Sequence, residues 1–445
     1  MADRDADAVI VGSGPGGATV ADVLTDAGWS VVVLEKGRNH LIDTEPPHTP
    51  RFEFSNDEPK FSFRHFLGPD PLAEPRTFRR TPDDGDRLFT GDVNNLPSTV
   101  GGGGTHADGK LPRFREVDFR LRTELGPVDG ADVRDWPIGY EDLEPYYAAV
   151  ERAIGVAGDH TANPFAAWRS GPYPMPPGPD MFGATLSVPA AERLGLHPYR
   201  APTGANSVPY DGRPACNDCG FCGDYGCPIH AKGDPIAMLA RALATGRCDL
   251  RAESNVTDVL LDASGRRATG VRYLHADGEA REVRADHVVL AAGAFETPRL
   301  LLLCGVGNSS GLVGRNLMYH FQTFTVGGFP FPLHGHRGRS VTHLHDDFCV
   351  PGEDDLVAAR DAGLPWIRGG IVEHGAAAHP IQEALNYPTG PLHNACMRDS
   401  SLRDHLWVFT MQGEDLAQPA NRIDLAPSAR DVWGRPAGRV TYAPH

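Results

Sequence analysis

The segment that most constrains the fold of this chain is AVIVGSGPGGATVADVLTDAGWSVVVLEKG, residues 8–37. It begins with an apolar run typical of a buried strand, breaks at glycines, and continues with Ala18, Ala21 and Leu24 at helical spacing. A second apolar run, from Ser30 to Leu34, closes the segment. This order predicts a βαβ unit, in which one helix connects two parallel strands.

The turn of this unit carries the pattern G-x-G-x-x-G at Gly12, Gly14 and Gly17. The first glycine permits a tight turn, the second lets the backbone approach a pyrophosphate, and the third lets helix and strand pack closely. Glu35 ends the second strand, where a carboxylate can accept hydrogen bonds from ribose hydroxyls. The complete unit predicts a dinucleotide site; the alternatives are a glycine turn without a ligand and a surface glutamate.

The overall charge argues against a polyanionic partner. Asp and Glu outnumber Lys and Arg by 58 to 42, and no basic run is present, so we expect neither nucleic acid nor anionic lipid as a partner. The N-terminal MADRDADAVIVGSG lacks the basic region of a signal peptide, and the longest apolar runs, at 288–294 and 300–303, are too short to span a membrane. We expect a cytoplasmic enzyme with a small-molecule substrate.

A second candidate signature is ADHVVLAAGAFETPRLLLLCG, residues 285–305. It predicts a buried strand, a turn of small residues at 291–294 and a helix from about Glu296. Small residues would let the chain pass close to a cofactor. Alone, the segment is equally consistent with a plain strand-to-helix turn.

Four further segments accompany these two: VGGGGTHADGKLPRF (100–114), GCPIHAKGD (226–234), VGRNLMYH (313–320) and the C-terminal GEDLAQPANRIDLAPSARDVWGRPAGRVTYAPH (413–445). Together, and in their order along the chain, the six segments resemble the glucose-methanol-choline (GMC) flavin oxidoreductases. The pattern is closest to bacterial sugar and gluconate-type dehydrogenase flavoprotein subunits. The resemblance implies FAD as cofactor and oxidation of a substrate CH–OH group by hydride transfer to flavin N5. It implies an α/β fold in which a Rossmann-like FAD domain is joined to a substrate domain with an antiparallel sheet.

The resemblance also implies which residues contact FAD. Its pyrophosphate loop, ribose carboxylate, isoalloxazine loop, adenine contact and second signature all have matching positions in this chain. These are Gly12, Gly14, Gly17, Glu35, Gly101, Gly102, Gly103, Thr105, His106, Val256, Ala292, Gly293 and Thr297.

His106 follows four consecutive glycines, 101–104, whose backbone has no Cβ atoms to keep it from a flat ring. Some family members attach the flavin covalently through a histidine in this loop. The resemblance therefore suggests the hypothesis that His106 is covalently attached to the flavin. The alternatives are a histidine near the flavin without a bond and a flexible, solvated surface loop.

Four cysteines, Cys216, Cys219, Cys222 and Cys227, form C-x2-C-x2-C-x4-C-P. The spacing is one residue longer than that of the bacterial ferredoxin run, and some dehydrogenases that this chain resembles carry an iron–sulfur cluster here. We expect such a cluster as the leading interpretation, passing electrons to an external acceptor protein or partner subunit. Structural zinc, two disulfides and four free thiols are the alternatives.

The remaining segments suggest the domain organisation. Helical spacing recurs at 140–156 and 234–246, and alternating segments after His320 predict an antiparallel sheet. We expect a discontinuous FAD domain with two lid segments and a C-terminal substrate domain. The ranges are 1–40, 95–160 and 205–320 for the FAD domain, 41–94 and 161–204 for the lids, and 321–445 for the substrate domain.

Two H-x-H pairs lie in the expected substrate domain, at His334 and His336 and at His343 and His345. Two such pairs could hold a metal ion. Histidines that line a cleft or face water are the preferred interpretation, because no spacing links the two pairs.

The resemblance implies a proton-accepting histidine, with a second histidine or asparagine, in a segment beyond the match to RVTYAPH. We expect that segment to be absent, so the catalytic base is unknown; neither His320 nor His445 matches its position. The alternative function is therefore a truncated or degenerate FAD-binding protein, or a subunit of a larger dehydrogenase complex. A pyridine-nucleotide-dependent flavin reductase is disfavoured because GVGNSSG, 305–311, is not preceded by a strand.

Overall fold

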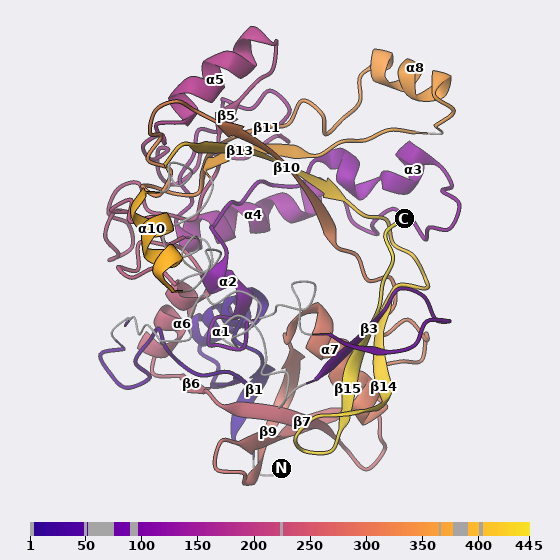
Figure 1. Ribbon diagram of the computed structural model, residues 1–445. Coiled ribbons are helices and arrows are strands. Elements are labelled where there is room, and N and C mark those ends of the chain that lie inside the picture. The colour runs from indigo at the N-terminus through magenta and orange to yellow at the C-terminus, as the bar shows by residue number, and fades with distance from the viewer. Residues whose placement is uncertain are drawn as a thin grey trace.

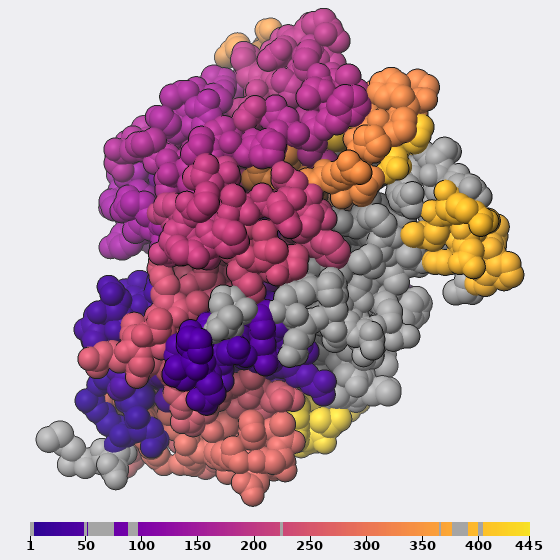
Figure 2. All heavy atoms as spheres, turned by 90° about the vertical axis from the view of Figure 1, so that its left-hand side faces the viewer, coloured from indigo at the N-terminus to yellow at the C-terminus, as the bar shows by residue number. Residues whose placement is uncertain are grey.

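The computed structural model describes residues 4–48, 51, 75–89, 97–222, 226–364, 366–376, 390–399 and 404–445. The described strands form three sheets. The N-terminal strands and the six-stranded sheet lie in the lower half of Figure 1, and a five-stranded sheet lies in the upper half. Figure 2 shows the same division, with the magenta and purple segment above the indigo and rose segments.

The six-stranded sheet is built around the N-terminal strand. Its order is β6-β2-β1-β9-β8-β7, with β1 parallel to both β2 and β9, and with β7, β8 and β9 as an antiparallel meander. The strands are β1 (Ala6–Val11), β2 (Val31–Leu34), β6 (Cys248–Arg251), β7 (Ser254–Leu261), β8 (Ala268–His275) and β9 (Ala280–Leu290).

The predicted βαβ unit is confirmed. Helix α1 (Pro15–Asp26) connects β1 to β2 and packs against α6 (Pro235–Ala244). Ile10, Ala18 and Val33 are completely buried in the core that these elements share. All four residues of β2 are buried. Because both faces of a parallel sheet are covered, such a strand is apolar on both faces, which is why it reads as a continuous apolar run in the sequence.

The five-stranded sheet is antiparallel, in the order β10-β13-β12-β11-β5. Helix α5 (Ala184–Arg193) lies above it in Figure 1 and packs against β11 and β12. Its strands are β5 (Tyr199–Arg200), β10 (His320–Gly328), β11 (Val341–His345), β12 (Ile371–Ala376) and β13 (Leu406–Glu414). The antiparallel sheet expected after His320 is therefore present, and the fold-class prediction is confirmed.

A third sheet joins the C-terminal hairpin to two strands from the first expected lid segment. Its order is β14-β15-β3-β4, and β15 is parallel to β3. Its strands are β3 (Arg76–Arg79), β4 (Arg87–Phe89), β14 (Arg422–Arg430) and β15 (Pro436–Thr441). The expected domain division is not tested by these pairings and stays a prediction.

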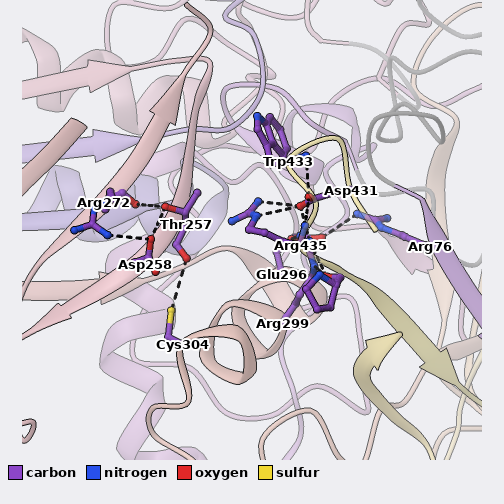
Figure 3. Close-up of polar contacts among 11 residues, drawn as sticks. Arg76, Thr257, Asp258, Arg272, Glu296, Arg299, Cys304, Asp431, Trp433 and Arg435 are labelled. Carbon is purple, nitrogen blue, oxygen red and sulfur yellow. Dashed lines mark hydrogen bonds and ion pairs between the residues drawn. The ribbon is translucent and has the colours of Figure 1, made fainter. Parts of the chain in front are cut away.

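An ionic network fastens this sheet to α7 (Gly293–Cys304) (Figure 3). Arg299 donates to Asp431 at 2.8 Å and to Glu296 at 3.2 Å, and Arg435 donates to the same oxygen of Asp431 at 3.1 Å. Burial alone would raise the pKa of Glu296, but Lys36, Arg299 and Arg76 lower it to about 2. The carboxylate is thus ionised at neutral pH and holds its cations in place.

The other described helices connect these sheets. They include the predicted helix at 140–156, observed as α4, and the predicted helix at 234–246, observed as α6. Within the described residues, no helix is both long and apolar enough to cross a membrane. The connecting helices are α2 (Gly102–His106), the 3-10 turn Glu116–Phe119, α3 (Leu121–Leu125), α4 (Tyr140–Ile154), α8 (Glu353–Asp361) and α10 (Pro391–Asp399).

Candidate cofactor and substrate site

The two predicted dinucleotide signatures lie side by side at the ends of neighbouring parallel strands. Gly12 has φ +97°, and a Cβ there would lie 2.6 Å from the carbonyl oxygen of Ala291. A Cβ on Gly17 would lie 1.9 Å from the carbonyl oxygen of Gly12. These two glycines are therefore required by close backbone approaches, as the motif predicts.

Gly14 differs from its neighbours because a Cβ there would meet no described atom within 4 Å. It caps α1 in an extended conformation, so the first amides of α1 point toward this open side. Open space at a helix N-terminus, where the partial positive charge of the helix lies, fits a pyrophosphate.

Ser13 connects the first glycine turn to Glu35 and to the glycine run. Its amide and hydroxyl donate to Glu35 Oε2 at 3.0 and 2.7 Å, and its hydroxyl accepts from the amide of Gly101 at 2.9 Å. The amide of Gly37 donates to Glu35 Oε1 at 2.8 Å. The ribose carboxylate that the resemblance implies is thus fixed in orientation by its own loop.

The glycine run enters the short helix α2, which packs against both α1 and α6 and lies above them in Figure 1. Gly101 has φ +88°, and a Cβ on Gly102 would lie 3.2 Å from the Cα of Gly14. A Cβ on Gly104 would lie 2.6 to 2.8 Å from the rings of Pro15 and Pro235. The run therefore brings a glycine-only backbone against the first turn, and the alternative of a flexible surface loop does not describe it.

Thr105 and His106 end this helix, and both are buried, with His106 7% exposed. Thr105 Oγ1 donates to the carbonyl oxygen of Gly102 at 2.9 Å. The side chain of His106 is therefore part of the packed site and is not solvated. Whether it bonds to a flavin is untested by the geometry and stays a prediction.

Lys232 is a buried cation beneath the same loop. Its Nζ donates to the carbonyl oxygens of Thr105 at 2.6 Å, Ala107 at 2.7 Å and Cys222 at 3.3 Å. One side chain thus joins the glycine run to the cysteine segment. The segment GCPIHAKGD contains this lysine, but no spacing within that segment indicates its role.

The second signature places its residues at the start of α7. Ala292 is the N-cap of this helix, and its amide donates to Thr297 Oγ1 at 3.1 Å. Gly293 follows with φ +75°. Val256 lies on β7, 9% exposed, in the apolar core that also contains Val11 and Leu34. Their contacts with a cofactor stay predictions.

All four cysteines of the predicted cluster are free thiols. Burial raises the pKa of Cys216 and Cys219 and raises that of Cys222 to about 12 despite the nearby Lys232. In the part of the chain that the structure describes, no group of three or more His, Cys, Asp or Glu could hold a metal ion. Residues 223–225 of this loop lie outside that part, and the iron–sulfur cluster stays a prediction.

The histidines of β11 face α5. His345 Nδ1 is 2.9 Å from His374 Nε2, and His374 Nδ1 is 3.0 Å from Ser187 Oγ. His343, His345 and His374 are all less than 9% exposed. The β11 histidines do not face water, because they are buried; that they line a cleft stays a prediction. His374 joins them from β12, and no local sequence pattern links it to the two pairs.

Comparison with known proteins shows which family the chain is similar to. The GMC oxidoreductase family model matches residues 186–322. The gluconate 2-dehydrogenase flavoprotein of Pantoea cypripedii is 30% identical over 99% of this chain and 76% of its own length. The 6'''-hydroxyparomomycin C oxidase of Streptomyces lividus is 33% identical over 97% of this chain and 74% of its own.

Among solved structures, the formate oxidase of Aspergillus oryzae superposes with a TM-score of 0.58 at 15% identity, covering 98% of this chain and 77% of that one. At this identity the superposition supports the fold alone. The sequence relatives are a dehydrogenase and an oxidase, so the chain is by class an oxidoreductase. It belongs to the GMC oxidoreductase family.

Proposed function

We propose that this chain binds FAD and oxidises a CH–OH group of a sugar, polyol or other alcohol. The observation that supports this most is the junction of two glycine segments, where Ser13 links Glu35 to Gly101 and where Gly102 approaches Gly14. One segment suits a pyrophosphate and the other a flat ring. A plain structural turn would not require both.

The chain's own residues would divide the binding between them. The α1 amides would bind the pyrophosphate, Glu35 would accept from the ribose hydroxyls, and the backbone at 101–103 would lie along the ring. Lys232 holds the adjoining backbone in place through the carbonyl oxygens of Thr105 and Ala107. The chemistry supplied by bound FAD is acceptance, at flavin N5, of the hydride that leaves the substrate carbon.

The route of the electrons after the flavin is a further part of the proposal. A relative is named as a fructose dehydrogenase large subunit, from Gluconobacter japonicus. By analogy, an acceptor protein or partner subunit would take the electrons from this chain. The cluster expected at Cys216, Cys219, Cys222 and Cys227 would lie on this route only if the loop rearranges, because the four described thiols do not form a metal-binding group as they stand.

The visible absorption spectrum of the protein, purified without oxygen, tests the cofactor. Flavin bands are the expected result, and a broad underlying brown absorption would add the cluster. Flavin that stays with the protein after acid precipitation would establish attachment, and loss of attachment in His106→Ala would assign it. A protein that stays colourless after incubation with FAD would contradict the proposal.

Anaerobic addition of alcohols and sugars then separates the enzyme from a non-catalytic FAD-binding subunit. Bleaching of the flavin bands by any CH–OH substrate is expected. A protein that dithionite bleaches but no substrate bleaches would favour the subunit role.

A further inference from the structure

The five-stranded sheet has a second face, opposite the one that α5 covers. Residues directly opposite each other in an antiparallel pair share a face. Glu373 pairs with Thr410, Thr410 pairs with Phe324, and Gln412 pairs with Gln322. These side chains therefore share the face that does not carry His374.

This second face is tied to the glycine run. Lys110, four residues after His106, donates to Glu373 Oε1 at 2.5 Å, and Gln412 Nε2 donates to the same oxygen at 3.2 Å. The segment after α2 thus reaches the underside of the sheet, which lies above α2 in Figure 1. The candidate cofactor site and this face are neighbours.

The cluster leaves one acceptor without a donor. Gln412 Oε1 is buried and has no hydrogen-bond partner among the described residues. Such an acceptor is costly unless another group donates to it. Because Gln412 Nε2 points at Glu373, the amide cannot turn its oxygen there without placing two acceptors together.

The same cluster has one donor in excess. Lys110 carries three N–H groups and contacts two carboxylates, Glu373 and Asp108, the latter at 3.2 Å. Ser340 donates to the other side, at Asp108 Oδ2, at 2.8 Å. An ammonium donor and an amide acceptor therefore remain on either side of Glu373.

We infer that Lys110, Glu373 and Gln412 select a neutral polyhydroxylated substrate, a sugar or polyol, and this inference rests on the proposed function. A hydroxyl both donates and accepts, so a vicinal diol would satisfy Gln412 Oε1 and Lys110 together. Phe324, 62% exposed on the same face, offers an apolar surface for the C–H side of such a molecule.

The charges set what the site rejects. Asp108 and Glu373 carry two negative charges against one positive charge on Lys110, so a substrate carboxylate here is repelled. A simple aliphatic alcohol has one hydroxyl and leaves part of the cluster unpaired. The expected order is neutral sugar or polyol first, with sugar acid and aliphatic alcohol well behind.

The test compares sorbitol, glucose, gluconate and butanol on the FAD-loaded protein. Anaerobic flavin reduction gives kcat and KM, and calorimetry on the oxidised protein gives Kd, so that binding is measured even for a compound that is not oxidised. We expect sorbitol or glucose to bind about tenfold or more tightly than gluconate.

Two variants and a control locate the effect. Gln412→Leu raises the KM or Kd of the polyol about tenfold with little change for butanol, because only the polyol uses the amide. Glu373→Gln narrows the preference over gluconate. Glu279→Gln, 72% exposed in the turn between β8 and β9, changes neither. Flavin content and thermal unfolding establish that each variant is folded.

The outcomes separate the two claims. A protein that binds no flavin contradicts the proposed function itself. Flavin reduction or binding by gluconate as effective as by the polyols overturns only the selectivity inference. So does a Gln412→Leu variant that behaves like Glu279→Gln.

Discussion

The six-stranded sheet and the five-stranded sheet are stabilised in different ways. Around the first, glycine backbones approach other backbones closely, as at Gly12 and Gly17, and the neighbouring strands β1 and β2 are apolar except for Asp7. In the second, polar side chains are buried between the strands and α5, as at His374, His345 and Ser187. The region around the six-stranded sheet therefore depends on the shape of the backbone, and the five-stranded sheet depends on hydrogen bonds between buried side chains.

This contrast suggests where each region tolerates change. A close backbone approach fails when one carbon atom is added, whereas a buried polar pair fails when one partner is removed. Lys232 combines both kinds of stabilisation, because its buried side chain donates to backbone carbonyl oxygens just after the glycine run, at Thr105 and Ala107. Substitutions in the two regions, and at Lys232, should therefore differ in how much they lower the free energy of unfolding.

Replacement of Lys232 by Met should cost the most. It removes the donor to three carbonyl oxygens, and we expect a loss of about 4 kcal/mol in the free energy of unfolding, with weaker flavin binding. Urea denaturation measures the loss. Arg247→Met is the control, because exposed Arg247 also donates to a carbonyl oxygen, that of Gly28 at 3.2 Å. Equal losses in both variants would contradict the prediction.

Gly17→Ala tests the backbone-shaped region directly. Its Cβ would lie 1.9 Å from the Gly12 carbonyl oxygen, so α1 must move away from β1, and we expect a loss of about 3 kcal/mol. Gly16→Ala is a matched control, since a Cβ there would meet only Ala291 Cβ at 4.0 Å. Unfolding and the ratio of flavin to protein absorbance are the measurements; a Gly17→Ala protein with normal flavin content would break the comparison.

The same contrast explains what the sequence could and could not predict. Gly12, Gly17 and the strand of Val31 to Leu34 lie within one short segment, so their spacing alone is enough to predict the βαβ unit. Lys110 and Gln412 are 302 residues apart, and both contact Glu373, which the register of β12 and β13 places beside Gln412. No local pattern carries that register.

The polar region also differed from expectation for a physical reason. Alternating histidines predict a strand with His343 and His345 on one face, and that face exists. Which face α5 covers depends on packing between distant segments, as shown by the contact of Ser187 with His374. Periodicity therefore predicted the strand correctly but could not predict its burial.

Acid should destabilise the polar sheet through His374. Burial, with His345 and His343 alongside, lowers its pKa to about 3, so the unfolded chain takes up a proton below about pH 6.5 that the folded chain refuses. The contribution of neutral His374 to the free energy of unfolding is therefore fully present above that pH, and the free energy falls by about 2 kcal/mol between pH 6.5 and pH 5. The groups that face it are Ser187 on α5, His343 and His345 on β11, and the ring of Phe409 on β13.

Urea denaturation at pH 7 and pH 5 measures this effect in the parent protein and in His374→Gln, which removes the titrating group. The variant should show about 2 kcal/mol less dependence on pH. His320→Gln, on the exposed edge strand β10, is the control and should keep the parent's dependence. An unchanged pH dependence in His374→Gln would locate the acid sensitivity elsewhere.

The smallest effect is expected at Ser187. Its hydroxyl is 3.0 Å from His374 Nδ1, and Ser187→Ala removes this single hydrogen bond at a cost of about 1 kcal/mol. Combined with His374→Gln, the two substitutions form a double-mutant cycle that isolates the pair. A coupling energy of about 1 kcal/mol would show that polar pairing, and not only the packing of α5, stabilises this sheet. If the decreases in the free energy of unfolding of the two single variants simply add, the hydrogen bond between Ser187 and His374 does not stabilise the sheet. The two sheets would then differ in the residues that they bury, and not in the kind of interaction that stabilises them.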